Sequence, residues 1–346
     1  MEDTALQGGG DGLLTEGLKL LITPPEGGTR EAAALCQSVT WGGSYDQAAR
    51  TLDFPLLVCP ADKHLPAVDC PPGSRVQFYR GERLLFDGFV FSRQRDTLSN
   101  TVEVSCADRG LYLKRNQGAY RFRGQTPEAI AGRVAADFGL TVGSLARTGT
   151  AISRNFPGVS LYQIIQTAYT QASAATGGRY MVRFRGEALE VIEKKQGERT
   201  LALRPGSNLI SLTATDSVES LVNRVQILSR DGTAKGSPVE DGASIARYGL
   251  FQQMVTESSG RDAAAEARKL LEDNAPAQKI TAQVRGNPTL IAGECAVLQE
   301  PVTGLYGLCW IDSDTHTWKG GVYTTKLVLN FRSIMDEQEA GRLPDA

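Results

Sequence analysis

The sequence predicts a mainly β protein with an α+β middle region. Short segments of alternating apolar and polar residues, divided by turn residues, run from Gly17 to Cys106 and again beyond residue 206. This is the pattern of half-buried strands. Two helical patterns lie between the strand regions, within residues 124–178. The 37 glycines favour many turns, and a length of 346 residues favours two or three domains.

The first strand region contains the clearest hairpin pattern. In RVQFYRGERLLFDGFVF, the residues Arg80, Gly81 and Glu82 separate two apolar runs, as the loop of a hairpin does. The next segment, NTVEVSCAD, places its apolar residues on one face and its polar residues on the other. We therefore expect an antiparallel sheet or barrel in this region.

Two helices are expected in the middle region. In TPEAIAGRVAADFGL, Thr126 is the expected N-cap, Pro127 the first helical residue and Gly139 the C-terminal stop. The second helix is expected to begin near Ser160 and to end at Gly177. The apolar stripe of the first helix consists of Ile130, Val134 and Phe138.

A second hairpin and a second strand region follow. The hairpin YMVRFRGEALEVIEKK again uses Arg-Gly-Glu as its turn, at residues 185–187. Strand patterns return at 208–228, and the polar, turn-rich stretch at 229–247 predicts an inserted mobile loop. Residues 261–273 predict a helix that Asn274 and Pro276 stop. Four further strand candidates are KITAQVRG, GECAVLQ, YGLCWIDS and VYTTKLVLNF.

Charge and composition argue against several classes of function. The net charge of −2 provides no basic field, so we expect no specific nucleic-acid binding. No apolar run reaches eighteen residues, so we expect no membrane insertion by this chain. The first 16 residues are acidic and glycine-rich and lack the pattern of a secretion signal, which predicts a flexible N-terminus.

The six cysteines lack any C-x-x-C spacing. We expect reduced thiols and no disulfides. Cys59, His64 and Cys70 could contribute to a zinc site, but a fourth ligand is missing and the spacings fit no common zinc module.

Residues that could carry out catalysis are scarce. Only His64 and His316 titrate near neutral pH, and neither has neighbours that suggest a nucleophilic site. The segment GGSYD, residues 42–46, lacks the G-x-S-x-G spacing of a nucleophile elbow and precedes strand-like residues, so we interpret it as a turn. Glycine-rich phosphate-binding motifs are absent. We therefore expect no enzyme activity and no cofactor.

One cluster could hold a divalent ion. In IDSDTHTW, Asp312, Asp314 and His316 would share a face of an extended strand. Asp-Ser-Asp-Thr is also favourable turn composition. We favour the turn and predict no metal site, and the bound ion stays the alternative.

Most aromatic residues fall in strand registers, where core packing is the expected role. Arg50 is different, because it shares strand parity with the apolar Leu52 and Phe54, where an unpaired charge would be costly. Arg50 is therefore either a polar anchor of an interface between chains or the solvated start of a strand. The aromatic residues assigned to the core are Phe54, Phe78, Phe86, Phe89 and Phe331.

Several motifs occur in an order that resembles XkdQ-like tail proteins, which belong to the gpD-like hubs of phages and phage-derived contractile particles. Trp41 and Gly42, followed by Ala-Arg-x-Leu at residues 49–52, resemble the first barrel of that family. GQTPEAIAGRVAADFGL resembles its first middle-region helix, and SLYQIIQTAYTQASAATGGRYMVRFRGEALEVI its second helix and hairpin. HTWKGGVYTTKLVLNF resembles its closing strands, so the likeness covers about residues 18–332. The turn at residues 42–44 departs from the family pattern.

The resemblance implies a structural, homotrimeric baseplate hub. Each chain would give two tube-type antiparallel β-barrels that flank and interleave with a smaller α+β domain, and the trimeric ring would adapt a hexameric tail tube to a trimeric spike around an axial channel. The implied partners are the chain itself, the tail tube protein, the spike protein and other baseplate or tape-measure-associated proteins. The implied location is the bacterial cytoplasm during assembly and then the baseplate of the particle.

The expected domains follow from the patterns and the resemblance together. Candidates for the subunit interface are Arg50, Trp41 and His316. The alternative function is a tail-associated peptidoglycan hydrolase, which would need two close carboxylates in a cleft or a metal at Asp312, Asp314 and His316. The expected boundaries are 1–16 for a flexible N-terminus, 17–118 for the first barrel, 119–205 for the α+β domain, 206–335 for the second barrel with an inserted loop (229–247) and helix (261–273), and 336–346 for a polar C-terminal tail.

Overall fold

The computed structural model describes residues 17–58, 66–197, 200–258 and 262–344. The chain divides into two compact units. The first contains the chain up to Leu212 and again from Thr281 onward, and the second contains Thr213–Ile280. Along the chain, the second unit is therefore an insertion in the first.

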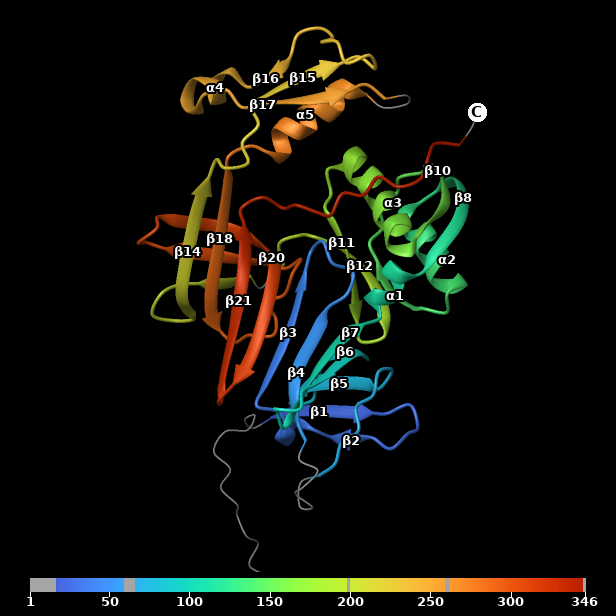
Figure 1. Cartoon of the computed structure of the whole chain (residues 1–346), viewed down its shortest axis with the longest axis vertical. Coiled ribbons are helices and arrows are strands. Elements are labelled where there is room, and N and C mark those ends of the chain that lie inside the picture. Colours follow the sequence, from blue (N-terminus) through green and yellow to red (C-terminus); the bar gives the residue numbers. More distant parts are fainter. Residues whose placement is uncertain (1–16, 59–65, 198–199, 259–261, 345–346) are drawn as a thin grey trace, which may run out of the picture. The chain divides into compact units, whose positions relative to one another are not determined.

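The first unit is built around a 13-stranded sheet (Figure 1). Its strands follow the order β14-β18-β21-β20-β3-β4-β7-β6-β5-β1-β2, while β19 pairs with β20 and β13 pairs with β19. Parts of β14 and β18 belong to the second unit. The strands are β1 (Leu18–Thr23), β2 (Arg30–Glu31), β3 (Ser38–Ser44), β4 (Thr51–Leu57), β5 (Arg75–Arg80), β6 (Arg83–Arg95), β7 (Thr101–Asp108), β13 (Leu201–Leu203), β14 (Leu209–Ser217), β18 (Ala277–Arg285), β19 (Cys295–Glu300), β20 (Leu305–Lys319) and β21 (Val322–Asn330).

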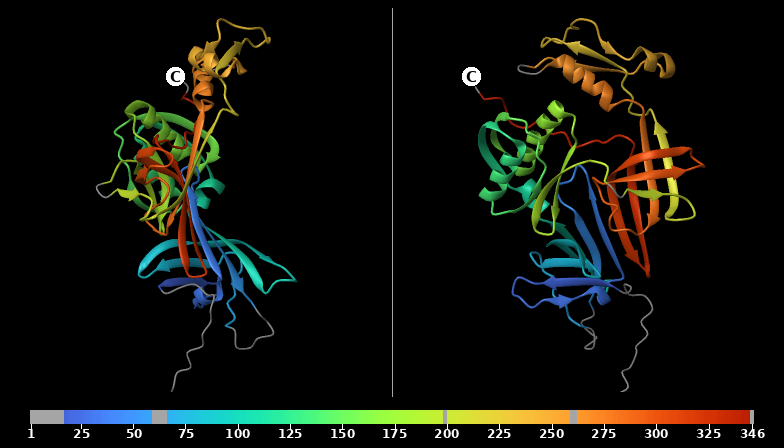
Figure 2. Two further views of the ribbon diagram at one scale, coloured as in Figure 1. Left: turned by 90° about the vertical axis from the view of Figure 1, so that its left-hand side faces the viewer. Right: turned by 180° about the vertical axis from the view of Figure 1, so that it is seen from behind.

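Strand β20 joins the two strand regions that the sequence separates. Its first part, Leu305–Trp310, pairs with β19, and its second part, Ser313–Lys319, pairs with β3. The red β20 therefore runs beside the blue β3 in Figures 1 and 2. The predicted mainly β fold with an α+β middle region is confirmed. The two strand regions form one continuous open sheet, and no sheet in the described part of the chain closes into a barrel.

Both Arg-Gly-Glu segments form tight hairpin turns, as predicted. Gly81 and Glu82 link β5 to β6, and Gly186 and Glu187 link β11 (Tyr180–Arg185) to β12 (Ala188–Glu193). Gly81 has a φ of 57° and Gly186 a φ of 58°. Only glycine adopts this left-handed region without a steric cost.

The core of the first strand region consists of alternating side chains. Leu52, Phe54 and Leu56 on β4 are each at most 1% exposed, because every second residue of the strand faces the same side. Phe78 and Phe86 are buried as predicted. Phe89 is only half-buried, and the prediction for Phe331 is wrong, because this residue follows the last residue of β21 and is 36% exposed.

The middle region packs helices against two small sheets. Strands β8 and β10 pair with each other, and β12 pairs with both β11 and β9. Its hydrophobic core includes Tyr169 and Phe156, which are at most 1% exposed. The elements are α1 (Gly110–Arg115), β8 (Gln117–Gln125), α2 (Pro127–Asp137), β9 (Thr141–Leu145), β10 (Ile152–Ser160), α3 (Leu161–Thr176), β11 and β12.

Local sequence signals fix both long helices of this region. The Thr126 side chain caps α2, and Ser160 forms a capping box with Gln163 at the start of α3. Gly177 ends α3 in the left-handed conformation. The predicted apolar stripe of α2 is wrong at Phe138, which is the C-cap residue and is 39% exposed.

The C-terminal segment is packed against the middle region. The Tyr162 hydroxyl lies 2.7 Å from the Asp336 carboxylate, and Nζ of Lys194 donates to the carbonyl of Ile334 over 2.8 Å. The backbones of Asn155 and Arg342 exchange two hydrogen bonds of 2.9 Å. The red segment after β21 accordingly crosses the helices of the middle region in Figure 2.

The second unit is a small α/β element. Strand β15 (Arg224–Leu228) pairs in parallel with β17 (Gln252–Thr256) and antiparallel with β16 (Val239–Glu240), and α5 (Ala263–Asp273) packs on them. Helix α5 lies where the sequence predicts it. The stretch predicted as a loop instead contains β16 and most of α4 (Gly242–Tyr248), because the Asp241 side chain caps the first turn of this short helix.

Among the described residues, no helix is both long enough and apolar enough to cross a membrane.

Candidate functional site

The candidate site is built from two neighbouring cross-strand rows of the large sheet. The first row crosses four strands and consists of Thr325 on β21, His316 on β20, Trp41 on β3 and Leu52 on β4. In the adjacent row, Asp314 pairs with Gly43, and continuing the β3–β4 register by one residue places Arg50 opposite Gly43. Arg50 and Asp314 therefore flank a residue that has no side chain.

Arg50 reaches across β3 and forms an ion pair with Asp314. Nη1 of Arg50 donates to Oδ1 of Asp314 over 3.0 Å, and Nη2 donates to Oδ2. The Asp314 side chain is fully buried and that of Arg50 is 12% exposed. Arg50 is thus paired within the chain, and the alternative of a solvated strand start is wrong. Removing one partner of a buried pair leaves an uncompensated charge.

The turn interpretation of GGSYD is correct only for its second part, because Gly42, Gly43 and Ser44 belong to β3 and the turn follows at Tyr45 and Asp46. Strand β3 ends at Ser44, and the amide of Gln47 donates to the Ser44 carbonyl over 3.2 Å. The Ser44 hydroxyl donates to the Asp46 carboxylate, which is the usual chemistry of a turn. A Cβ atom on Gly42 would lie 2.8 Å from the Asp314 carbonyl oxygen. The glycine pair therefore allows β20 and Arg50 to come close to β3.

His316 links the ion pair to an aromatic stack. Its Nε2 lies 3.1 Å from Oδ2 of Asp314, and its Nδ1 lies 2.9 Å from the Tyr323 hydroxyl. The Trp41 and His316 rings are 4.7 Å apart between centroids, and the Arg50 guanidinium lies 4.2 Å from the centroid of Trp41. The arrangement combines an ion pair with a cation–π contact.

Burial and the ion pair shift the pKa values of the site in known directions. Burial lowers the pKa of His316 below its ordinary value, and Asp314 offsets this only in part. Burial alone would raise the pKa of Asp314, but the charge of Arg50 and the contact with His316 bring this pKa below its ordinary value. At neutral pH the site therefore holds a carboxylate, a guanidinium and a neutral imidazole.

Asp312 does not join Asp314 and His316 in a ligand set. A register shift between Ile311 and Ser313 interrupts the regular alternation of β20 at this residue. The Asp312 carboxylate accepts a hydrogen bond from Asn330 over 3.2 Å. Within the described ranges, no group of three acidic, histidine or cysteine residues is placed to hold a metal ion.

The predicted zinc candidates cannot be assembled from the described residues. Cys59 and His64 lie outside them. Cys70 is a buried free thiol, and burial raises its pKa to about 12. The described cysteines, which are Cys36, Cys70, Cys106, Cys295 and Cys309, are all free thiols.

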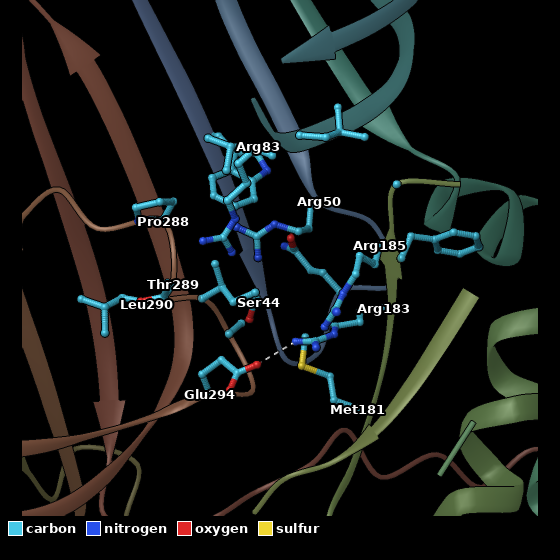
Figure 3. A pocket seen from close by; sticks show the side chains of 18 of the residues that line it. Ser44, Arg50, Arg83, Met181, Arg183, Arg185, Pro288, Thr289, Leu290 and Glu294 are labelled. Carbon is cyan, nitrogen blue, oxygen red and sulfur yellow. Dashed lines mark hydrogen bonds and ion pairs between the residues drawn. The ribbon is translucent and has the colours of Figure 1, made fainter. Parts of the chain in front are cut away.

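Trp41 and Arg50 line a cavity of about 550 Å³. Its other walls come from the start of β6, the β11–β12 hairpin and the segment between β18 and β19. Figure 3 shows Arg50, Arg83, Arg183 and Arg185 around this space, with Glu294 on the opposite side. Nη1 of Arg183 lies 3.1 Å from the Glu294 carboxylate. Four arginines and one carboxylate thus line the cavity.

A second buried carboxylate holds the β11–β12 hairpin close to the large sheet. Asp87 on β6 is 3% exposed and accepts hydrogen bonds from Arg75, Gln77 and Arg109. Glu187, in the second Arg-Gly-Glu turn, binds Arg75 and Arg109 as well. The second of the reused turns contributes Arg185 and Gly186 to the cavity wall, and Arg83, which follows the first turn, lines the same cavity. Sequence reasoning noted the repeated turn but missed this network, because its partners are far apart in the chain.

The predicted interface candidates lie together in the structure. Trp41 contacts both Arg50 and His316, and Trp41 and His316 are at most 4% exposed. Their contact with a neighbouring chain stays a prediction. The signal that identified them was the charge of Arg50 in an apolar register, and nothing in the sequence indicated that Asp314 is its partner.

Known proteins share both sequence and fold with this chain. XkdQ, a protein of the phage-like element PBSX of Bacillus subtilis, is 25% identical over 88% of this chain and 94% of its own length. The tail protein of prophage MuSo2 from Shewanella oneidensis superposes with a TM-score of 0.70 at 13% identity, over 92% of this chain and 99% of that chain. An E. coli type VI secretion component, described as similar to the T4 tail proteins gp27 and gp5, gives a TM-score of 0.53 at 14% identity, over 90% of this chain and 76% of that chain.

These likenesses agree with the resemblance that the ordered motifs predict. At these identities the structural matches show a shared fold. The family model described as YQBQ-like matches residues 39–330, which is most of the chain and includes every strand of the candidate site. The chain belongs to the YQBQ-like family.

Proposed function

We propose that this chain is a structural hub of the baseplate of a phage tail or of a phage-derived contractile particle. The observation that carries the proposal is the end-to-end match, in sequence to the PBSX protein XkdQ and in fold to a prophage tail protein. The described likeness of the type VI secretion component to gp27 and gp5 supports the hub position.

In this proposal, three copies form a ring around an axial channel. Each copy gives two tube-type β-barrel segments, so that the ring matches a hexameric tail tube on one side and a trimeric spike on the other. Other baseplate or tape-measure-associated proteins bind around it. The chain assembles in the bacterial cytoplasm and then resides in the baseplate.

The open edges of the large sheet support a ring. Strand β14 stands at one end of the strand order, and Ile210 on it is 54% exposed. An unpaired edge of this kind invites pairing with another chain. A closed ring of identical subunits needs two different complementary surfaces on each chain, and the ends of the strand order at β14 and β2 are candidates for them.

The interface candidates enter the proposal indirectly. Trp41 contacts Arg50 and His316 within the chain. We propose that these three residues support the wall of the cavity that Trp41 and Arg50 line, and that this wall is part of the subunit interface. In the same proposal, residues 17–118 form the first tube-type segment, residues 119–205 the α+β domain, and residues 206–335 the second tube-type segment.

The solution mass tests the ring. Light scattering after size-exclusion chromatography should give three times 37.2 kDa, and electron microscopy with the tube protein should show rings that cap tubes.

Ile210→Lys should weaken the trimer, because it places a charge on the exposed sheet edge. Leu98→Lys, at a residue that is 96% exposed in a loop, should leave the trimer intact. A chain that stays monomeric at every concentration and binds neither tube nor spike protein would refute the hub.

The proposed hub is not an enzyme. A glycosidase that cleaves peptidoglycan typically uses two close carboxylates, and Glu294 is the one carboxylate among the described residues that line the cavity. Zymography with purified chain on peptidoglycan should show no clearing. If the natural chain clears peptidoglycan and the Glu294→Gln variant does not, the hydrolase would be the better explanation of the function than the hub.

A further inference from the structure

Two residues of the arginine-lined cavity carry buried donors that no described atom of the chain satisfies. Nε of Arg50 and Nε1 of Trp41 are buried and have no hydrogen-bond partner among the described residues. Both residues line the cavity. A buried donor without a partner costs roughly 1–3 kcal/mol, so an acceptor that reached either of these atoms would stabilise the folded chain.

Positively charged side chains outnumber negatively charged ones among the described residues that line the cavity. Arg50 is neutralised by Asp314, while Arg183 and Arg185 share Glu190, and Arg183 also binds Glu294. Arg83 has no ion pair within the described part of the chain and is exposed at the cavity wall. The cavity therefore favours an anion.

Apolar side chains also line the cavity, so the bound anion should carry apolar groups as well as negative charge. Leu84, Leu85, Met181, Leu290 and Ile291 line the same space as the arginines. A nucleic-acid backbone prefers a continuous basic groove, and the whole chain carries a net charge of −2. A peptide that carries both carboxylates and apolar side chains fits this mixture, because carboxylates accept fork hydrogen bonds from arginine.

We propose that this cavity binds a short peptide segment of a neighbouring protein, with a Glu or Asp side chain directed at Arg50 and Arg83 and with apolar side chains against Leu84 and Leu290. A volume of about 550 Å³ is within the range of ordinary ligand sites. The supplier of the peptide rests on the proposed hub function, whereas the binding itself is a property of the isolated chain.

Fluorescence anisotropy with labelled synthetic peptides tests the proposal. The probe is a short peptide in which Glu and Leu alternate, and the comparison peptide has Gln in place of Glu. The full-length chain should bind the Glu peptide and should bind the Gln peptide about tenfold more weakly, which is a difference of about 1.4 kcal/mol. Equal affinity for the two peptides would overturn the proposal.

A variant pair separates the cavity from general surface charge. Arg83→Glu should weaken binding of the Glu peptide at least about tenfold because it reverses the unpaired charge. Arg95→Glu, on the same strand but outside the cavity, should leave the affinity unchanged. Equal losses in the two variants would overturn the proposal. Both residues are exposed, and unchanged thermal unfolding of the variants shows that they fold.

Competition with inorganic tripolyphosphate distinguishes a carboxylate site from a phosphate site. Tripolyphosphate should displace the Glu peptide poorly, because it cannot use the apolar wall. Displacement at concentrations as low as those of unlabelled Glu peptide would overturn the peptide proposal. The trimer measurement is independent of this assay, so a failure of peptide binding and a failure of the hub can be told apart.

Discussion

A Cβ atom on Gly43 would lie 2.7 Å from Nη1 of Arg50. Gly43 occupies the middle of the row that Arg50 must cross to reach Asp314. Gly43→Ala should therefore displace the guanidinium and destabilise the fold by about 1–3 kcal/mol. Urea unfolding measures the loss. Gly242→Ala is the control, because nothing lies within 4 Å of an added Cβ there, and an equal loss in the control would contradict the steric explanation.

Removing the charge of Arg50 should be costly. In Arg50→Met, the buried Asp314 loses its counter-charge, and we expect a loss of about 3–5 kcal/mol in the free energy of unfolding. Adding Asp314→Asn should recover part of this loss, because the amide is neutral and keeps an oxygen for the Ala292 N–H, which donates to Asp314 over 2.7 Å. Denaturant titrations of the two single variants and the double variant measure the coupling. Additive effects would show that the pair does not interact energetically.

Acidification should destabilise the chain through His316. Its pKa in the folded chain lies below the ordinary value of 6.5, so the unfolded chain binds more protons near that pH. The contribution of His316 is therefore fully present above pH 6.5 and is lost as the pH falls toward the folded pKa. In His316→Asn, the free energy of unfolding should depend less on pH between about 7.5 and 5.5 than in the natural chain. His64 is present in both proteins, so its contribution to the pH dependence cancels when the two are compared. Identical slopes would rule out this role.

The C-terminal segment should stabilise the middle region. The Tyr162 hydroxyl donates to the Asp336 carboxylate over 2.7 Å, and a hydrogen bond to a charged group contributes roughly 1.5–3 kcal/mol. Tyr162→Phe should lower the free energy of unfolding by about that amount, and hydrogen exchange should become faster at residues 336–342. Tyr306→Phe, at a tyrosine that is 59% exposed, should change stability by less than about 0.5 kcal/mol. Unchanged exchange in Tyr162→Phe would contradict the contact.

Local signals in the sequence predicted much of the fold. The cap at Thr126, the glycine at residue 177 and the two Arg-Gly-Glu turns act over a few residues, and the structure confirms each of them. Helix α4 was missed because a polar, glycine-containing stretch is typical of a loop, and the cap at Asp241 was the signal that could have revealed it.

The candidate site was predictable only in part. The register of Arg50 with buried residues indicated that it needs a partner, but the partner, Asp314, lies 264 positions away in the sequence. No local pattern specifies which distant strand pairs with β3. The cavity was not predictable for the same reason, since its walls come from five separate parts of the chain, at residues 41–50, 83–85, 181–186, 201 and 288–295.

The pairing of β3 with β20 has a consequence for the timing of folding. A strand near the N-terminus must wait for a strand near the C-terminus before its free edge is covered. Contacts of such long sequence separation form slowly, because a large loop must close before they contribute. During synthesis on the ribosome, the edge of β3 therefore stays open until β20 has been translated, and cellular chaperones have the opportunity to bind there before the two strands pair.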